Sequence, residues 1–240
     1  MATLSVRSIA SSCLDRQVPL SVKRQVFGVF GSNPQTRSLR RQLGLIQTKP
    51  FIRVAVVTVR PTGSTAGPYA NLQRDLDSAN QVWQAECGTW IYCVDSSVAV
   101  TGIFGSNGIL NQNSCPLGEQ DDPTSEEDAL FDLGRGRGAD VVGYFIAGST
   151  NPALGGCSAY PEGRRGFWVQ FNASRWMFAH ELTHVIGLNP HPNQDSQVPD
   201  NDQDNLMWPT PGAITNPPPD LRGAQCSRIS NDDGLDSCGG

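Results

Sequence analysis

The chain has 240 residues, of which 38% are hydrophobic and 17% charged, a composition typical of a soluble protein with one well-cored domain or a domain plus an extension. No apolar run is long enough to cross a bilayer, so we expect no membrane span. The net charge is −5, but residues 1–50 hold eight Lys and Arg against one acid, Asp15, so the remaining residues carry −12. Such an acidic body argues against a nucleic-acid partner.

The first predicted elements are a strand, a helix and a second strand. Residues 51–60, FIRVAVVTVR, are rich in valine and typical of a buried strand. Gly67-Pro68 is expected to open a helix, because proline tolerates the first helical position, and an apolar stripe continues it to Cys87-Gly88. Residues 90–94, WIYCV, predict the next strand, and the Gly-, Asn- and Ser-rich residues 102–118 predict a loop.

The second half of the body alternates in the same way. A capping box formed by Ser125 and Asp128 predicts a short helix over 126–133. Residues 139–148 and 167–171 predict strands, with 155–163 as a loop or edge segment between them. Helices are expected over 174–188 and 220–230. This order predicts an α/β sandwich with a mixed sheet.

The basic residues 1–50 form a predicted N-terminal extension, a leader or a propeptide, before a catalytic domain over 51–240.

The seven cysteines of the chain indicate the cellular compartment in which the protein works. Six lie in the body, enough for three disulfide bonds, with Cys157–Cys226 as one candidate pair. Such a number favours a secreted or extracytoplasmic protein. Residues 1–17 lack the continuous apolar core of a secretory signal, which leaves a cytoplasmic protein with reduced thiols as the alternative.

The chemistry is concentrated in the sequence HELTH, residues 180–184. On a helix, His180 and His184 share one face, so both imidazoles can bind the same ion. Glu181 lies beside the first ligand, where its carboxylate can take a proton from a water that zinc has made acidic. The pattern predicts a zinc-dependent hydrolase with Glu181 as general base.

Together with the downstream DNLMWP at 204–209, the run HELTHVIGLNPH resembles the metzincin clan of zinc peptidases, including its reprolysin-like members. The resemblance extends over most of residues 51–230. It implies a twisted five-stranded mixed sheet with a long backing helix, an active-site helix and a C-terminal helix. By the same resemblance, Gly187 turns the chain after the active-site helix, and Met207 lies in a methionine turn beneath the metal. Residues 208–219 shape the pocket for the substrate side chain after the scissile bond.

The third metal ligand departs from that family pattern. The family's position, six residues after the second histidine, holds Pro190, which cannot bind zinc through its side chain. His191 follows and is the last histidine in the chain, so it is assigned as the third ligand, with Asp195 as the alternative. Calcium is a second candidate ion, for the acidic cluster of Asp195, Asp200, Asp202 and Asp204.

We therefore expect a monomeric zinc endopeptidase that holds an extended polypeptide and cleaves internal peptide bonds. Two alternatives stay open: a catalytically silent binding module with the same fold, and a zinc amidohydrolase with a non-peptide substrate. The presence of Glu181 favours an enzyme, because a structural zinc site needs no base.

Overall fold

The computed structural model describes residues 50–105, 108–112 and 115–235, so Cys13, Cys238 and nearly all of the predicted extension lie outside the described residues. Its centre is a five-stranded, mostly parallel sheet in the order β2-β1-β4-β7-β5. The strands are β1 (Phe51–Pro61), β2 (Trp90–Thr101), β4 (Val141–Ile146), β5 (Gly156–Cys157) and β7 (Gly166–Gln170). β5 alone runs antiparallel, to β7, at one edge. The predicted α/β fold with a mixed sheet is confirmed.

The burial pattern of each strand agrees with its position in this sheet. β1 pairs in parallel with β2 on one side and with β4 on the other. Its valine-rich residues are buried on both faces, as expected for an inner parallel strand. β2 is an edge strand and alternates between exposed and partly buried residues along its second half. It extends to Thr101, beyond the predicted end at residue 94, because β1 supplies a partner along its whole length.

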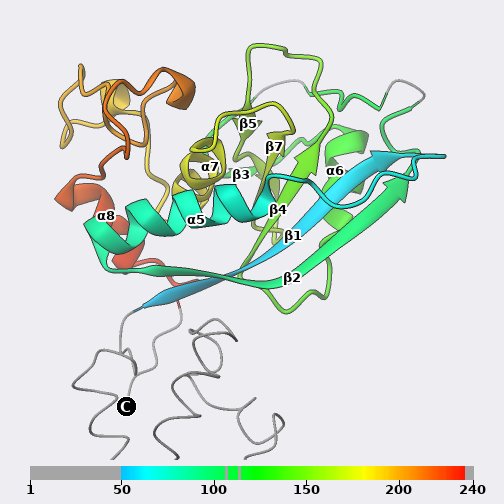
Figure 1. Ribbon diagram of the computed structural model, residues 1–240, viewed down its shortest axis with the longest axis horizontal. Coiled ribbons are helices and arrows are strands. Elements are labelled where there is room, and N and C mark those ends of the chain that lie inside the picture. The colour runs from blue at the N-terminus through cyan, green and yellow to red at the C-terminus, as the bar shows by residue number, and fades with distance from the viewer. Residues whose placement is uncertain (1–49, 106–107, 113–114, 236–240) are drawn as a thin grey trace, which may run out of the picture.

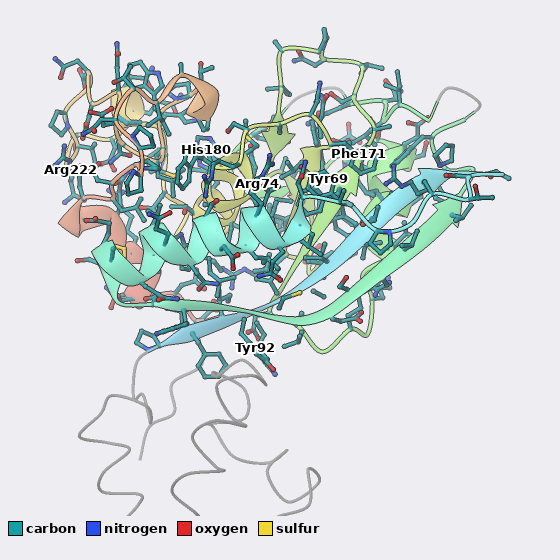
Figure 2. All side chains as sticks on the ribbon, viewed as in Figure 1. Tyr69, Arg74, Tyr92, Phe171, His180 and Arg222 are labelled. Atoms are coloured by element: carbon teal, nitrogen blue, oxygen red, sulfur yellow. A yellow bond between two sulfur atoms is a disulfide. The ribbon has the colours of Figure 1, made fainter. Side chains whose placement is uncertain are left out.

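Two helices cover one face of the sheet, as Figure 1 shows: α5 (Leu72–Val82) and, beside it, α7 (Met177–Val185). A π-helical turn, η1 (Trp83–Cys87), continues α5 to the left-handed Gly88. The predicted start at Pro68 is wrong. The Tyr69 amide donates to Thr58 Oγ1 (3.0 Å), and the Tyr69 ring stacks on Phe145 and Phe171, so tertiary contacts hold this segment out of the helix (Figure 2).

The smaller elements refine the prediction. α6 (Ser125–Asp132) has its capping box at Thr124 and Glu127, one residue before the predicted pair. The segment 155–163 supplies β5 and β6 (Tyr160–Pro161), and β6 pairs with β3 (Glu119–Gln120). α8 (Gly223–Ser230) follows the two short 3-10 helices η2 (Pro192–Gln194) and η3 (Pro211–Ala213).

Within the described residues, two disulfide bonds join distant segments, Cys87 with Cys226 and Cys115 with Cys157. The predicted Cys157–Cys226 pair is wrong, because α8 lies against the end of α5 while Cys157 lies in the edge strand β5. Cys93 is a free thiol among the described residues. In the part of the chain that is described, none of the helices combines the length and apolarity needed to cross a membrane.

Candidate metal centre

Helix α7 places the three central residues of the site. His180, Glu181 and His184 are only 3%, 4% and 6% exposed, on a helix whose other residues are also largely buried. The apolar Phe178, Leu182 and Val185 pack into the core and fix the rotation of the helix. With that rotation fixed, the two histidines one turn apart point the same way.

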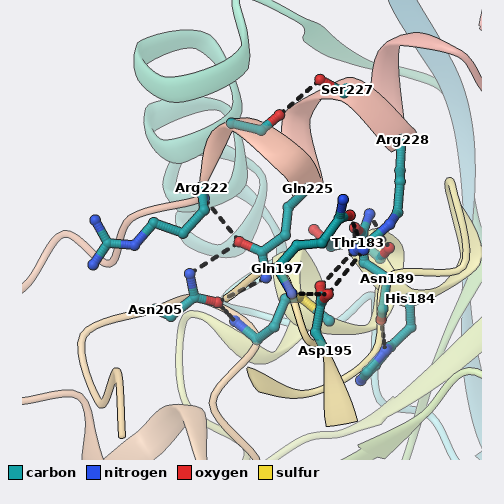
Figure 3. A network of polar contacts seen from close by, with 12 residues as sticks. Thr183, His184, Asn189, Asp195, Gln197, Asn205, Arg222, Gln225, Ser227 and Arg228 are labelled. Atoms are coloured by element: carbon teal, nitrogen blue, oxygen red, sulfur yellow. Dashed lines mark hydrogen bonds and ion pairs between the residues drawn. The ribbon is translucent and has the colours of Figure 1, made fainter. Parts of the chain in front are cut away.

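The turn after α7 carries His191 back to the helix. Gly187 and Leu188 both have positive φ, 73° and 47°, and this reverses the chain. A Cβ on Gly187 would lie 2.6 Å from the carbonyl carbon of Arg228, so glycine is required by space as well as by φ. The Asn189 side chain then donates to the carbonyls of Thr183 and Ile186 (3.3 and 3.1 Å) and closes the end of the helix (Figure 3).

The three imidazoles converge on one point. His184 Nε2 lies 3.1 Å from His180 Nε2 and 3.2 Å from His191 Nε2, and the candidate ligand atoms of all three lie within 4.8 Å of one another. Two nitrogens bound tetrahedrally to one zinc ion at 2.0–2.1 Å stand about 3.3 Å apart. The three histidines can therefore hold a metal ion together.

Hydrogen bonds fix which ring nitrogen faces this point. His180 Nδ1 donates to the Leu206 carbonyl (2.8 Å), and His184 Nδ1 donates to the Asn189 carbonyl (2.5 Å), which leaves both Nε2 lone pairs free for a metal. Burial lowers the pKa of His180 to about 3 and also lowers the pKa of His184 and of His191. All three rings are therefore neutral at pH 7, the form that binds metals.

The segment that carries Met207 lies against the first histidine. Met207 is fully buried, and its amide donates to Asn205 Oδ1 (3.0 Å). Asn205 in turn exchanges two hydrogen bonds with the buried Gln225 side chain of α8 (Figure 3). This network fixes the Leu206 carbonyl that orients His180.

Glu181 lies between α7 and the edge strand. A Cβ on Gly156 would lie 2.7 Å from both Cγ and Oε1 of Glu181, so the carboxyl packs directly on the backbone of β5. Burial raises the pKa of Glu181 to about 8, and a hydrogen bond with the Ser158 side chain opposes that shift. A cation in the neighbouring histidine cluster would favour the ionised carboxylate.

An open cleft of about 440 Å³ is lined by the three histidines and Glu181. Besides the three histidines and Glu181, most of its lining residues are apolar or glycine, and Glu181 is the one ionisable lining residue other than the histidines. The remaining lining residues are Cys115, Pro116, Leu117, Ala153, Leu154, Gly155, Gly156, Ser158, Met177, Pro190, Gln194, Pro209 and Thr210. Pro209 and Thr210 belong to the segment that the family resemblance places at the substrate pocket.

Asp195, the alternative third ligand, has another partner. Its carboxylate forms an ion pair with Arg228 at 2.5 and 2.9 Å, and Arg228 also donates to Asn189 Oδ1. The Arg228 bond lowers the pKa of Asp195. Among the other acids predicted to bind calcium, Asp202 pairs with Arg222, and Asp204 accepts from Thr215 and the Asn216 amide. Within the described residues the histidine cluster is the one grouping able to hold a metal, so the calcium prediction lacks support.

Sequence reasoning missed three residues of the site: Ser158 beside Glu181, Asn189 at the helix end and Arg228 on Asp195. Nothing in the local sequence marks Ser158 or Arg228, because each contacts a residue of the site that is distant in sequence. For Asn189 a signal existed, since asparagine, after glycine the next most typical residue, is found where helices end. The structure brings His180, His184 and His191 together and places them with Glu181 in the lining of one cleft.

No protein-family model matches the chain, and no curated protein matches it. Among solved structures, metalloproteinase-II from Bacteroides fragilis is 12% identical, with a TM-score of 0.45, over 74% of this chain and 52% of that one. A structure described as a chaperone–substrate complex is 12% identical, with a TM-score of 0.35, over 62% of this chain and 25% of that one. The chain therefore spans about half the length of the first and a quarter of the second, and at these TM-scores neither likeness bears on function.

Proposed function

We propose that this protein is a zinc-dependent endopeptidase whose catalytic domain is residues 51–240. The observation that carries the proposal is the convergence of three neutral imidazoles beside a buried glutamate in one open cleft. Three histidines with a further position left open are the ligand set of catalytic zinc, and nitrogen donors argue against magnesium or calcium. His180, His184 and His191 would hold the ion, with Gly187 and Met207 in supporting roles.

Bound zinc supplies a Lewis acid that polarises a carbonyl and makes water acidic near neutral pH. Glu181 would accept a proton from the attacking water while the water oxygen bonds to the scissile carbonyl carbon. The same carboxyl group would then give that proton to the leaving amine as the C–N bond breaks. The products are a new carboxylate and a new amine. Ser158 and the Gly156 backbone would keep the carboxyl in position.

The edge strand supports a peptide as substrate. β5 pairs with β7 on one side and is the end of the described sheet on the other. An extended chain could add to that edge through backbone hydrogen bonds and so lie across the cleft. The two disulfide bonds support a secreted or extracytoplasmic protein. We propose that it acts as a monomer.

The test uses the full-length protein on a reduced, unfolded protein substrate. Cleavage should stop when a chelator removes the metal and return when one equivalent of zinc is restored, and product mapping should locate cuts inside the chain. Zinc bound without any cleavage would favour the binding module. Hydrolysis of small amides without cleavage of the protein would favour the amidohydrolase.

A further inference from the structure

Two exposed leucines come from neighbouring segments near the histidine cluster. Leu117 lines the cleft and is 41% exposed, while Leu188, in the turn that leads to His191, is 52% exposed. A Cβ on Gly118 would lie 2.8 Å from Leu188 Cδ2, so the Leu188 side chain lies against the backbone next to Leu117. We call Leu117 and Leu188 the leucine ridge.

The ridge is held on rigid supports. The Cys115–Cys157 disulfide bond ties the segment before Leu117 to the edge strand β5. The Gly118 carbonyl accepts from the Tyr160 amide (3.1 Å), and the β3–β6 pair follows directly. Leu188 is fixed by its neighbours, the crowded Gly187 and the doubly bonded Asn189.

Holding these leucines in water is unfavourable. Leu188 is the one non-glycine with positive φ among the described residues, and leucine is disfavoured in that conformation. Apolar side chains that gather at a cleft are typical of a ligand site. Pro116 and Pro190 flank the ridge in the cleft lining, and the lining contains no Lys, Arg or Asp that could receive a charged group.

We infer that the leucine ridge is a specificity site that contacts a large apolar side chain of the substrate, such as Leu, Phe or Met, on the side of the scissile bond where His191 lies. This inference rests on the proposed peptidase function. A peptide that crosses the cleft along β5 would pass the ridge, and an apolar side chain there would remove both leucines from water.

The test measures peptide binding separately from cleavage. Zinc-loaded full-length protein carrying Glu181→Gln is titrated with a set of peptides in which Leu replaces Ser at one position at a time. One position near the centre should give about 10-fold tighter binding with Leu, the scale at which apolar pockets discriminate. Leu117→Ser and Leu188→Asn should each remove most of that preference. Asparagine tolerates positive φ, so Leu188→Asn should stay folded.

Val100→Ser is the matched control, since Val100 is also 52% exposed but lies on β2, at the opposite edge of the sheet from β5. It should leave the preference unchanged. Equal binding of all peptides, or a preference that survives both ridge variants, would overturn the inference. If Glu181→Gln protein shows the preference but wild-type protein cleaves nothing, the peptidase proposal fails and the apolar site stands. If wild-type protein cleaves the substrate but no apolar preference is seen, the apolar site fails and the peptidase proposal stands.

Discussion

Each imidazole of the cluster is set by its own neighbours. His180 and His184 commit Nδ1 to backbone carbonyls, whereas His191 is half-buried and reaches the cluster through the turn after α7. His191 is therefore the proposed ligand whose role most needs testing. We predict that His191→Ala lowers zinc affinity at least about 100-fold, the effect of losing a ligand or its support. Asp195→Asn should keep zinc affinity within about 10-fold, because Asp195 pairs with Arg228. Competition with a chromophoric chelator measures both; a larger loss in Asp195→Asn would reverse the ligand assignment.

Asp75, on α5, is a buried carboxylate outside the cleft. It is 1% exposed, and its Oδ2 has no hydrogen-bond partner, while Arg74 bonds the other oxygen. Burial raises the pKa of Asp75 to about 6 from 3.8, against the opposing effects of Arg74, Tyr69 and Arg175. Between those pH values the folded state binds a proton that the unfolded state does not, so this group's contribution to stability falls as pH rises.

Asp75→Asn should therefore gain stability relative to wild type as pH rises from 4 to 7, by on the order of 2 kcal/mol. Urea unfolding of both proteins at four pH values measures the difference. A constant difference across the range would show that Asp75 has the same pKa in both states.

At the scale of elements, most helices and strands of the sheet follow from periodicity, and their ends do not. The valine-rich β1 and the apolar stripe of α5 carry local signals. The start of α5 depends on Tyr69 stacking against Phe145, a contact with a strand far away in sequence. The edge strand β5 has two residues and pairs only with β7, so the segment 155–163 carries no periodic signal that would locate it.

The end of α7 illustrates the same limit for the site. The family resemblance implied a turn at Gly187, and the structure shows why glycine is needed there: a positive φ and the backbone of Arg228. Gly187→Ala should cost at least about 2 kcal/mol of folding free energy and weaken zinc binding, because the turn delivers His191. Gly163→Ala is the matched control, since Gly163 also has positive φ but nothing within 4 Å of an added Cβ. It should cost only about 1 kcal/mol. Equal losses in thermal or urea unfolding would contradict the steric argument.

At the scale of the whole molecule, the two disulfide bonds found among the described residues have different consequences. Cys87–Cys226 spans 139 residues and joins the end of α5 to α8, while Cys115–Cys157 spans 42 and fixes the cleft wall. Chain-entropy estimates give about 5 and about 4 kcal/mol of stabilisation. Replacing the Cys87–Cys226 pair by serine should lower stability but leave KM near the wild-type value. Replacing the Cys115–Cys157 pair should also raise KM. Unfolding curves measure the stability of both variants, and steady-state kinetics measure their KM. An unchanged KM in the variant without Cys115–Cys157 would show that this cleft wall takes no part in substrate binding.

The fold class was predictable from sequence because it depends on the order of strands and helices, and the candidate site was proposed from the one-turn spacing of His180 and His184. The disulfide pairing was not predictable from sequence, since packing alone brings Cys87 to Cys226 and keeps Cys157 away from both. The same holds for Ser158 and Arg228, which reach the site across elements.

The most direct test of the central claim compares zinc-loaded wild type with Glu181→Gln on one unfolded protein substrate, with zinc content measured in the same samples. The account predicts one zinc in each protein and a rate at least about 1000-fold lower in the variant, because Gln cannot accept the proton. Equal cleavage by both proteins, or wild-type protein that binds zinc and cuts nothing, would contradict it.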